Sequence, residues 1–234
     1  MRRFLLSLAL LFFSNTAFSD DHAETNIPEF AAVFQVTTTD EASVAAAFAN
    51  FAQSECRKNM PTAIRIMRES FNGNEDVTHS IIWNFADAAA MTEAFASLAQ
   101  CRDWANVSAV LSRQADFKSQ QLMRTLVAGG DYTKDSSYAV WQMSISDEAA
   151  YVKAYETLME AQVKNGSVNG AYGLWRVQGG ADSKVTHLAF AGAENLEGLL
   201  ANANPSKAFV AFQRKVAGIR TVYRQNINTV LADL

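Results

Sequence analysis

The 234-residue sequence predicts an α+β fold made of two tandem units, each with the element order β-α-β-β-α-β. Three observations predict this fold: segments that repeat at a nearly constant offset, short alternating apolar strands, and helices with apolar residues three or four positions apart. The composition is globular, with 49% hydrophobic and 19% charged residues. A net charge of −4 argues against nucleic acid as a partner, because phosphate binding requires a clustered basic surface.

Segments of the first half recur in the second half. Residues 34–41 align with residues 141–148 at an offset of 107, and residues 77–79 align with 185–187 at an offset of 108. Near the ends of the halves, Leu126-Val127-Ala128 matches Val230-Leu231-Ala232 at an offset of 104. We interpret the chain as a tandem duplication of residues 30–129 and 138–234. The joining segment 130–137 contains Gly, Asp and Ser, which is typical of a linker.

The first unit is predicted to begin with a strand over 32–38 that ends at Asp40, a good helix N-cap. An amphipathic helix follows, with Val44, Phe48 and Phe51 on its apolar face. The next element is a hairpin with strands over 62–70 and 77–85. A second helical region is expected over about 87–111, and the last strand over 119–127.

The second unit shows the same pattern. Its first strand covers 138–145 and ends at Ser146, and its first helix has Val152, Tyr155 and Met159 on the apolar face. The remaining elements are expected in the same order, at 171–178 and 185–191 for the hairpin, at about 195–216 for the helical region, and at 220–231 for the last strand.

This element order is that of the ferredoxin-like split βαβ unit, whose helices cover one face of the sheet and leave the other face bare. Two such units can pair their sheets as an intrachain α/β barrel with the helices outside. Residues 80–91 (SIIWNFADAAAM) resemble the strand-to-helix segment of the dimeric α/β-barrel superfamily, which includes antibiotic-biosynthesis and haem-degrading monooxygenases. The resemblance implies at most a cofactor-independent, monooxygenase-like activity. It also implies that Trp83 or Phe85 lines a cavity.

The N-terminus predicts export to the periplasm or the medium. Arg2 and Arg3 precede an apolar run over 4–13, and Ala17-Phe18-Ser19 provides small residues before a cleavage site. Residues 1–19 are therefore predicted as a signal peptide and 20–29 as a polar leader. Loss of the two arginines would change the net charge from −4 to −6. No later stretch reaches about 18 apolar residues, so no membrane span is expected after cleavage.

Cleavage after Ser19 would create the N-terminus Asp20-Asp21-His22. Its amine, two backbone amides and the imidazole form a nitrogen set that suits Cu(II) or Ni(II). The alternative is a solvated tail with an incidental histidine. The two cysteines, Cys56 and Cys101, lie in the first half, and the sequence leaves open whether they form a disulfide.

The candidate site residues come mainly in pairs related by the repeat. Strand alternation places Gln35 and Gln142 on the side expected to face the barrel interior, although they could instead hydrogen-bond across the seam between the halves. His79 and His187 are cavity candidates or half-buried sheet residues that the duplication retained.

Arg68 and Arg176 form another repeated pair. Facing inward they would bind a carboxylate or a phenolate, and facing outward, which we favour slightly, they would be solvated.

The predicted function is binding of a small, largely apolar ligand in the barrel interior. The alternatives are a non-catalytic exported interaction or oligomerisation protein and a haem binder that uses His79 or His187. No other cofactor and no metal centre within the folded units are expected.

Overall fold

The computed structural model describes residues 27–180, 184–201 and 206–234. The predicted signal peptide and the Asp20-Asp21-His22 metal site lie outside these described residues. Within the described part of the chain, no helix is long and apolar enough to cross a membrane.

In the described ranges, eight strands, all paired antiparallel, close into a barrel in the order β1-β3-β2-β8-β5-β7-β6-β4. Each half contributes four neighbouring strands in the same order, β4-β1-β3-β2 and β8-β5-β7-β6, and the halves join where β2 pairs with β8 and β4 pairs with β6. The strands are β1 (Phe30–Thr38), β2 (Ala63–Phe71), β3 (His79–Phe85), β4 (Ala115–Gly129), β5 (Ser137–Ile145), β6 (Tyr172–Gly179), β7 (His187–Ala193) and β8 (Arg220–Asp233).

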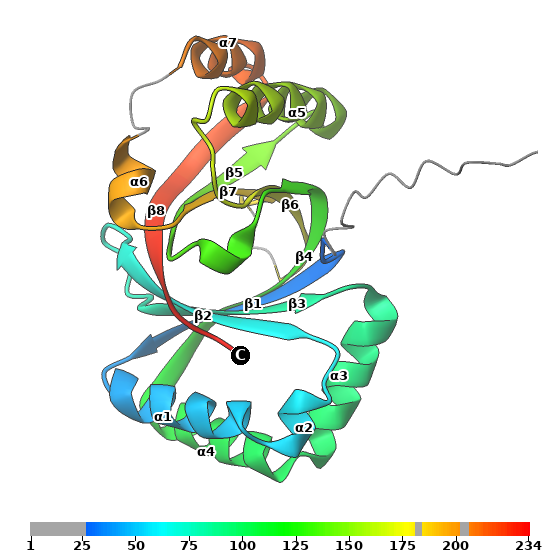
Figure 1. The fold of residues 1–234 in the computed structure, drawn as a ribbon, viewed down its shortest axis with the longest axis vertical. Helices are drawn as coiled ribbons and strands as arrows, with labels where there is room; N and C mark the ends of the chain where they lie inside the picture. The colour runs from blue at the N-terminus through cyan, green and yellow to red at the C-terminus, as the bar shows by residue number, and fades with distance from the viewer. Residues whose placement is uncertain (1–26, 181–183, 202–205) are drawn as a thin grey trace, which may run out of the picture.

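The helices lie outside the strands. Figure 1 shows α1 to α4 on one outer side of the molecule and α5 and α7 on the opposite side, with the strands between them. The helices are α1 (Glu41–Ala52), α2 (Glu55–Lys58), α3 (Ala88–Gln100), α4 (Arg102–Gln114), α5 (Glu148–Lys164), α6 (Leu196–Ala201) and α7 (Lys207–Val216), and a 3-10 turn, η1 (Tyr132–Lys134), lies in the linker. Each half therefore has one apolar core between its helices and its strands, and a further apolar cluster fills part of the barrel interior.

The predicted element order is observed in both halves, with local differences. The helical region expected at 87–111 is two helices, because Cys101 has an extended backbone between α3 and α4. Cys101 is disulfide-bonded to Cys56, with their Cα atoms 5.9 Å apart, which answers a question that the sequence left open. The short helix α2, which carries Cys56, was not expected.

The predicted N-cap Asp40 is confirmed, since its carboxylate accepts a hydrogen bond from the Ser43 amide. In the second half the N-cap is Asp147 rather than the expected Ser146, and its carboxylate accepts from the Ala150 amide. In both halves, the residue after the cap is a glutamate in the first turn of the helix.

Candidate functional site

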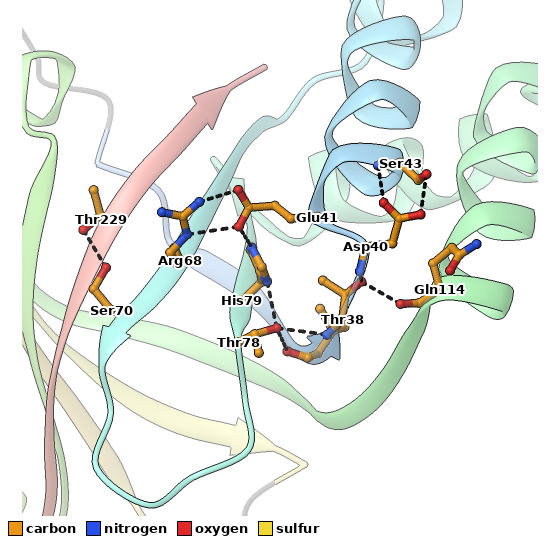
Figure 2. A network of polar contacts seen from close by, with 11 residues as sticks. Thr38, Asp40, Glu41, Ser43, Arg68, Ser70, Thr78, His79, Gln114 and Thr229 are labelled. Carbon is orange, nitrogen blue, oxygen red and sulfur yellow. Dashed lines mark hydrogen bonds and ion pairs between the residues drawn. The ribbon is translucent and has the colours of Figure 1, made fainter.

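His79 is buried on the helix-covered side of β3 and belongs to a polar cluster that Figure 2 shows. Its Nε2 atom is 2.9 Å from Glu41 Oε2, and its Nδ1 atom is 2.8 Å from Thr78 Oγ1. Arg68 donates two hydrogen bonds to the same Glu41 carboxylate, which lowers the pKa of Glu41. The Thr78 hydroxyl also accepts from the Thr38 amide at the end of β1. Through Glu41, the cluster ties β2 and β3 to the start of α1.

The second half repeats this cluster. His187 Nε2 lies 2.9 Å from Glu148 Oε2, and His187 Nδ1 lies 2.8 Å from Thr186 Oγ1. Arg176 Nη1 donates to Glu148 over 3.1 Å. Burial lowers the pKa of His187, and the hydrogen bond to Glu148 opposes that shift. Both clusters attach a strand to the first turn of a helix, which is a structural role for all six His, Glu and Arg side chains.

These positions decide between the alternatives that the sequence left open. Arg68 and Arg176 face outward, which was the favoured alternative, and the two histidines are buried sheet residues, so their expected place in the cavity wall is wrong. His79, His187, Arg68 and Arg176 do not line the barrel cavity described below, since they lie on the outer, helix-facing side of their strands. Both ring nitrogens of each described histidine are hydrogen-bonded to side-chain oxygens. They therefore do not fit the haem-ligand role that the sequence left as an alternative.

Trp83 and Phe85 also face the helices rather than the barrel interior. Both side chains are fully buried in the first helix-covered core. The Trp83 ring meets Trp104 of α4 edge to face, with ring centroids 5.3 Å apart. The expectation that one of these aromatics lines the cavity is therefore wrong.

A cavity of about 880 Å³ occupies the barrel interior. Gln35 and Gln142 line it, as the strand alternation indicated, and the Gln35 side chain accepts a hydrogen bond from Ser119. Its walls are largely apolar, and the apolar side chains in the wall include Val33, Met67, Ile82, Val140, Trp175, Leu188 and Phe190. The Trp175 and Phe190 rings pack against each other with centroids 4.8 Å apart.

Ile27, Tyr132 and Leu234 lie at one end of the cavity, which we call the mouth, and the Ile27 and Tyr132 side chains are exposed there. Arg65 is buried there and donates to Asp233 through Nε and Nη2, over 2.6 and 2.8 Å. It also donates to the Tyr138 hydroxyl and to the Tyr132 carbonyl. This one guanidinium therefore connects β2, β5, β8 and the linker. Burial raises the pKa of Tyr138, so its hydroxyl stays protonated at neutral pH.

Further from the mouth, the cavity contains a buried carboxylate, that of Glu69 on β2. Ser80 Oγ and the side-chain amides of Asn226 and Asn228 all donate to it. Asn226 also donates to Asn228 Oδ1 over 2.6 Å. This polar group joins β2, β3 and β8 across one of the two seams between the halves.

The sequence interpretation missed Arg65, Glu69 and Tyr138. One signal was present: Arg65 and Glu69 lie four residues apart on a predicted strand, so they share a face, and the alternating Asn226 and Asn228 give β8 a polar face. Charged residues on a strand usually face solvent, however, and nothing in the sequence indicated that this face encloses a cavity.

A second cavity of about 900 Å³ lies in the other half, between the sheet and α5, α6 and α7. Its lining includes Ala201 and Ser206, and the structure does not describe the residues between them in the sequence, so we do not assign this cavity a role. Within the described residues, one set of side chains has the spacing of a metal site, Cys56, Cys101 and Asp103. Its two sulfur atoms are bonded to each other and cannot act as thiolate ligands.

No protein-family model matches the sequence, and no curated protein matches it. Solved structures share its fold. A "putative monooxygenase" from Lactobacillus acidophilus NCFM has a TM-score of 0.62 at 11% identity, covering 86% of this chain and 92% of that one. An anthrone oxidase-like protein has a TM-score of 0.55 at 11% identity, covering 89% and 94%. A chlorite dismutase mutant from Candidatus Nitrospira defluvii has a TM-score of 0.54 at 10% identity, covering 87% of this chain and 91% of that one. The TM-scores and coverages show a common fold that includes both halves of the chain, and at such low identities they show the fold alone.

Proposed function

We propose that this protein is exported and binds a small, largely apolar molecule inside its single-chain barrel. The observation that carries the proposal is the interior cavity of about 880 Å³, which is within the usual size range of small-molecule sites. Its apolar walls would bury the body of a ligand, and the buried Arg65, Glu69 and Tyr138 would orient it. An interior packed solid with side chains would have favoured the alternative, a non-catalytic interaction protein.

A neutral fluorescent dye such as Nile red tests this proposal directly. We expect the purified protein to bind the dye, and Val140→Trp, which places an indole in the cavity wall, to weaken binding about tenfold or more. Val163→Trp is the matched control, because Val163 is exposed on α5 and does not line this cavity. Equal dye affinity in both variants would place the dye elsewhere and contradict the proposal. Mass spectrometry of molecules that co-purify would identify a natural ligand.

A monooxygenase-like oxidation of the bound molecule is a second candidate function. The observation that favours it is the fold shared with proteins described as putative monooxygenases and with an anthrone oxidase-like protein. Oxygen uptake measured with the co-purified ligand tests it. Uptake that Val140→Trp abolishes and Val163→Trp preserves would support it, and the absence of uptake would leave ligand binding as the function.

We also infer that the two halves arose by duplication and that residues 1–19 are a cleaved signal peptide. The repeated strand order and the two Glu-His-Arg clusters support the duplication. N-terminal sequencing of protein recovered outside the cytoplasm tests cleavage, with Asp20 expected first. Detection of Met1 on the exported protein would contradict it.

A further inference from the structure

The charge inside the barrel cavity is not balanced. Its charged lining residues are Arg65, Glu69, Asp131 and Asp233. Arg65 and Asp233 form a two-point ion pair at the mouth and neutralise each other. Asp131 is exposed at the mouth, where it caps the turn η1. Glu69 is therefore the charged side chain of the inner cavity.

Glu69 is held by neutral groups. Its donors are the Ser80 hydroxyl and the amides of Asn226 and Asn228, and among the described residues no cation forms an ion pair with it. Arg224, two residues before Asn226 on β8, does not line the cavity, and its Nη1 atom lies 3.9 Å from Glu75 Oε2. Its Nε and Nη2 atoms are buried without a hydrogen-bond partner, so this guanidinium does not reach the Glu69 carboxylate. A buried carboxylate without a positive partner is costly, and this cost is recovered when a cation binds.

The same cluster also lacks hydrogen-bond donors. A carboxylate can accept about four hydrogen bonds, and three are present at Glu69. The Oδ1 atom of Asn226 is buried and has no partner. The orientation of this amide is fixed, because its Nδ2 atom donates to Glu69 and to Asn228. A group that brings both positive charge and several N–H donors would complete the cluster.

We propose that the ligand of this cavity is an amphiphilic amine, whose ammonium group binds at Glu69 while its apolar body lies along the barrel wall. This inference rests on the proposed function, namely that the cavity binds a small molecule. The four-residue separation of Arg65 and Glu69 along β2 gives the body a length of about 13 Å, at 3.3 Å per residue. Binding at Glu69 is reversible ion pairing and involves no covalent step.

Three probes with one apolar body and different polar ends test the inference by calorimetry: 2-(1-naphthyl)ethylamine, 2-(1-naphthyl)ethanol and 1-naphthylacetic acid. We expect the amine to bind about tenfold more tightly than the alcohol, and the acid to bind most weakly, at pH 7. Glu69→Gln should bring the affinity for the amine to within about threefold of that for the alcohol. Glu93→Gln on the exposed face of α3 is the matched control and should leave the order unchanged.

The outcomes separate the two proposals. If none of the three probes binds, the proposed function and this inference both fail. If all three bind equally, or the acid binds best, the cavity binds ligands but the inference is wrong. The comparison in the wild-type protein does not depend on the stability of Glu69→Gln. If that variant folds, as judged by near-UV circular dichroism, and still prefers the amine tenfold, then Glu69 is not the counterion and the inference is overturned.

Discussion

Replacing Arg65 with Met should destabilise the barrel much more than the same replacement at Arg68 on the same strand. The two arginines face opposite sides of β2: Arg65 is buried at the mouth of the cavity, whereas 49% of the Arg68 side chain is exposed. Methionine keeps most of the apolar stem in each case and removes the guanidinium. The pair of variants therefore compares a buried charge with an exposed one.

The expected magnitude follows from the partners of Arg65. The substitution removes charged hydrogen bonds to Asp233, Tyr138 and the Tyr132 carbonyl, and it removes a cation positioned 5.3 and 5.4 Å from the two tyrosine ring centroids. Breaking a buried ion pair costs about 3–5 kcal/mol. The lower end applies here, about 3 kcal/mol, because 54% of the Asp233 side chain is exposed and water can solvate it. The exposed pair of Arg68 and Glu41 should contribute less than about 1 kcal/mol.

Thermal and urea unfolding followed by circular dichroism measure both variants. For a chain of this size, about 3 kcal/mol corresponds to a decrease in Tm of roughly 6–12 °C. Arg68→Met should stay within about 3 °C of the wild-type protein. Equal losses in the two variants, or a loss below about 1 kcal/mol in Arg65→Met, would refute the conclusion that Arg65 holds the halves together.

Three further predictions concern pH, redox state and the dependence of one half on the other. Burial lowers the pKa of His187 below its usual 6.5, so as the pH falls this histidine takes up its proton in the unfolded chain before it does so in the folded protein. The free energy of unfolding should therefore fall as the pH decreases from 7 to 5.5, and equal slopes in wild-type protein and His187→Gln would contradict this. Reduction of the Cys56–Cys101 disulfide, which joins positions 45 residues apart, should cost about 2–4 kcal/mol by denaturant unfolding, and free thiols in unreduced protein would exclude the bond. Residues 20–129 expressed alone should aggregate or dimerise, because β2 and β4 lose their partners in the other half, and a stable monomer in light scattering would count against this.

The similar segments at offsets of 107 and 108 were enough to predict the element order of each half, because each segment supported the interpretation of its counterpart. The faces of β3 could not be predicted in the same way. Its two faces carry Trp83 and Ile82, and both are apolar because one packs under helices and the other lines the cavity. The structure decides between them through register, which places Ile82 beside Val33 and Ser80 beside Gln35. Register between distant strands is a tertiary property that alternation within one strand does not contain.

Among the site residues, too, those that depend on alternation within one strand could be predicted, and those that depend on long-range packing could not. Gln35 and Gln142 were predicted to face inward because the apolar side of their strands suited helix packing. The sequence indicates that His79 and His187 are equivalent. It does not indicate that Glu41 is the partner of His79 or that Glu148 is the partner of His187, because both glutamates stand out only as members of similar segments. Their meeting depends on where a helix begins relative to a neighbouring strand. Long-range packing sets that relation, and the spacing of residues along the chain does not.

The residues before β1, the residue after β8 and the linker all lie at one end of the barrel. Pro28 just before β1, Leu234 after β8 and the linker around Tyr132 all border the mouth, whereas the turn between β2 and β3 lies at the opposite end. A fluorescent protein or surface tether joined after Leu234 would therefore stand at the mouth. Attachment through the exposed turn at Gly73 leaves the mouth clear, and this makes the turn the suitable point for immobilising the protein in a sensor.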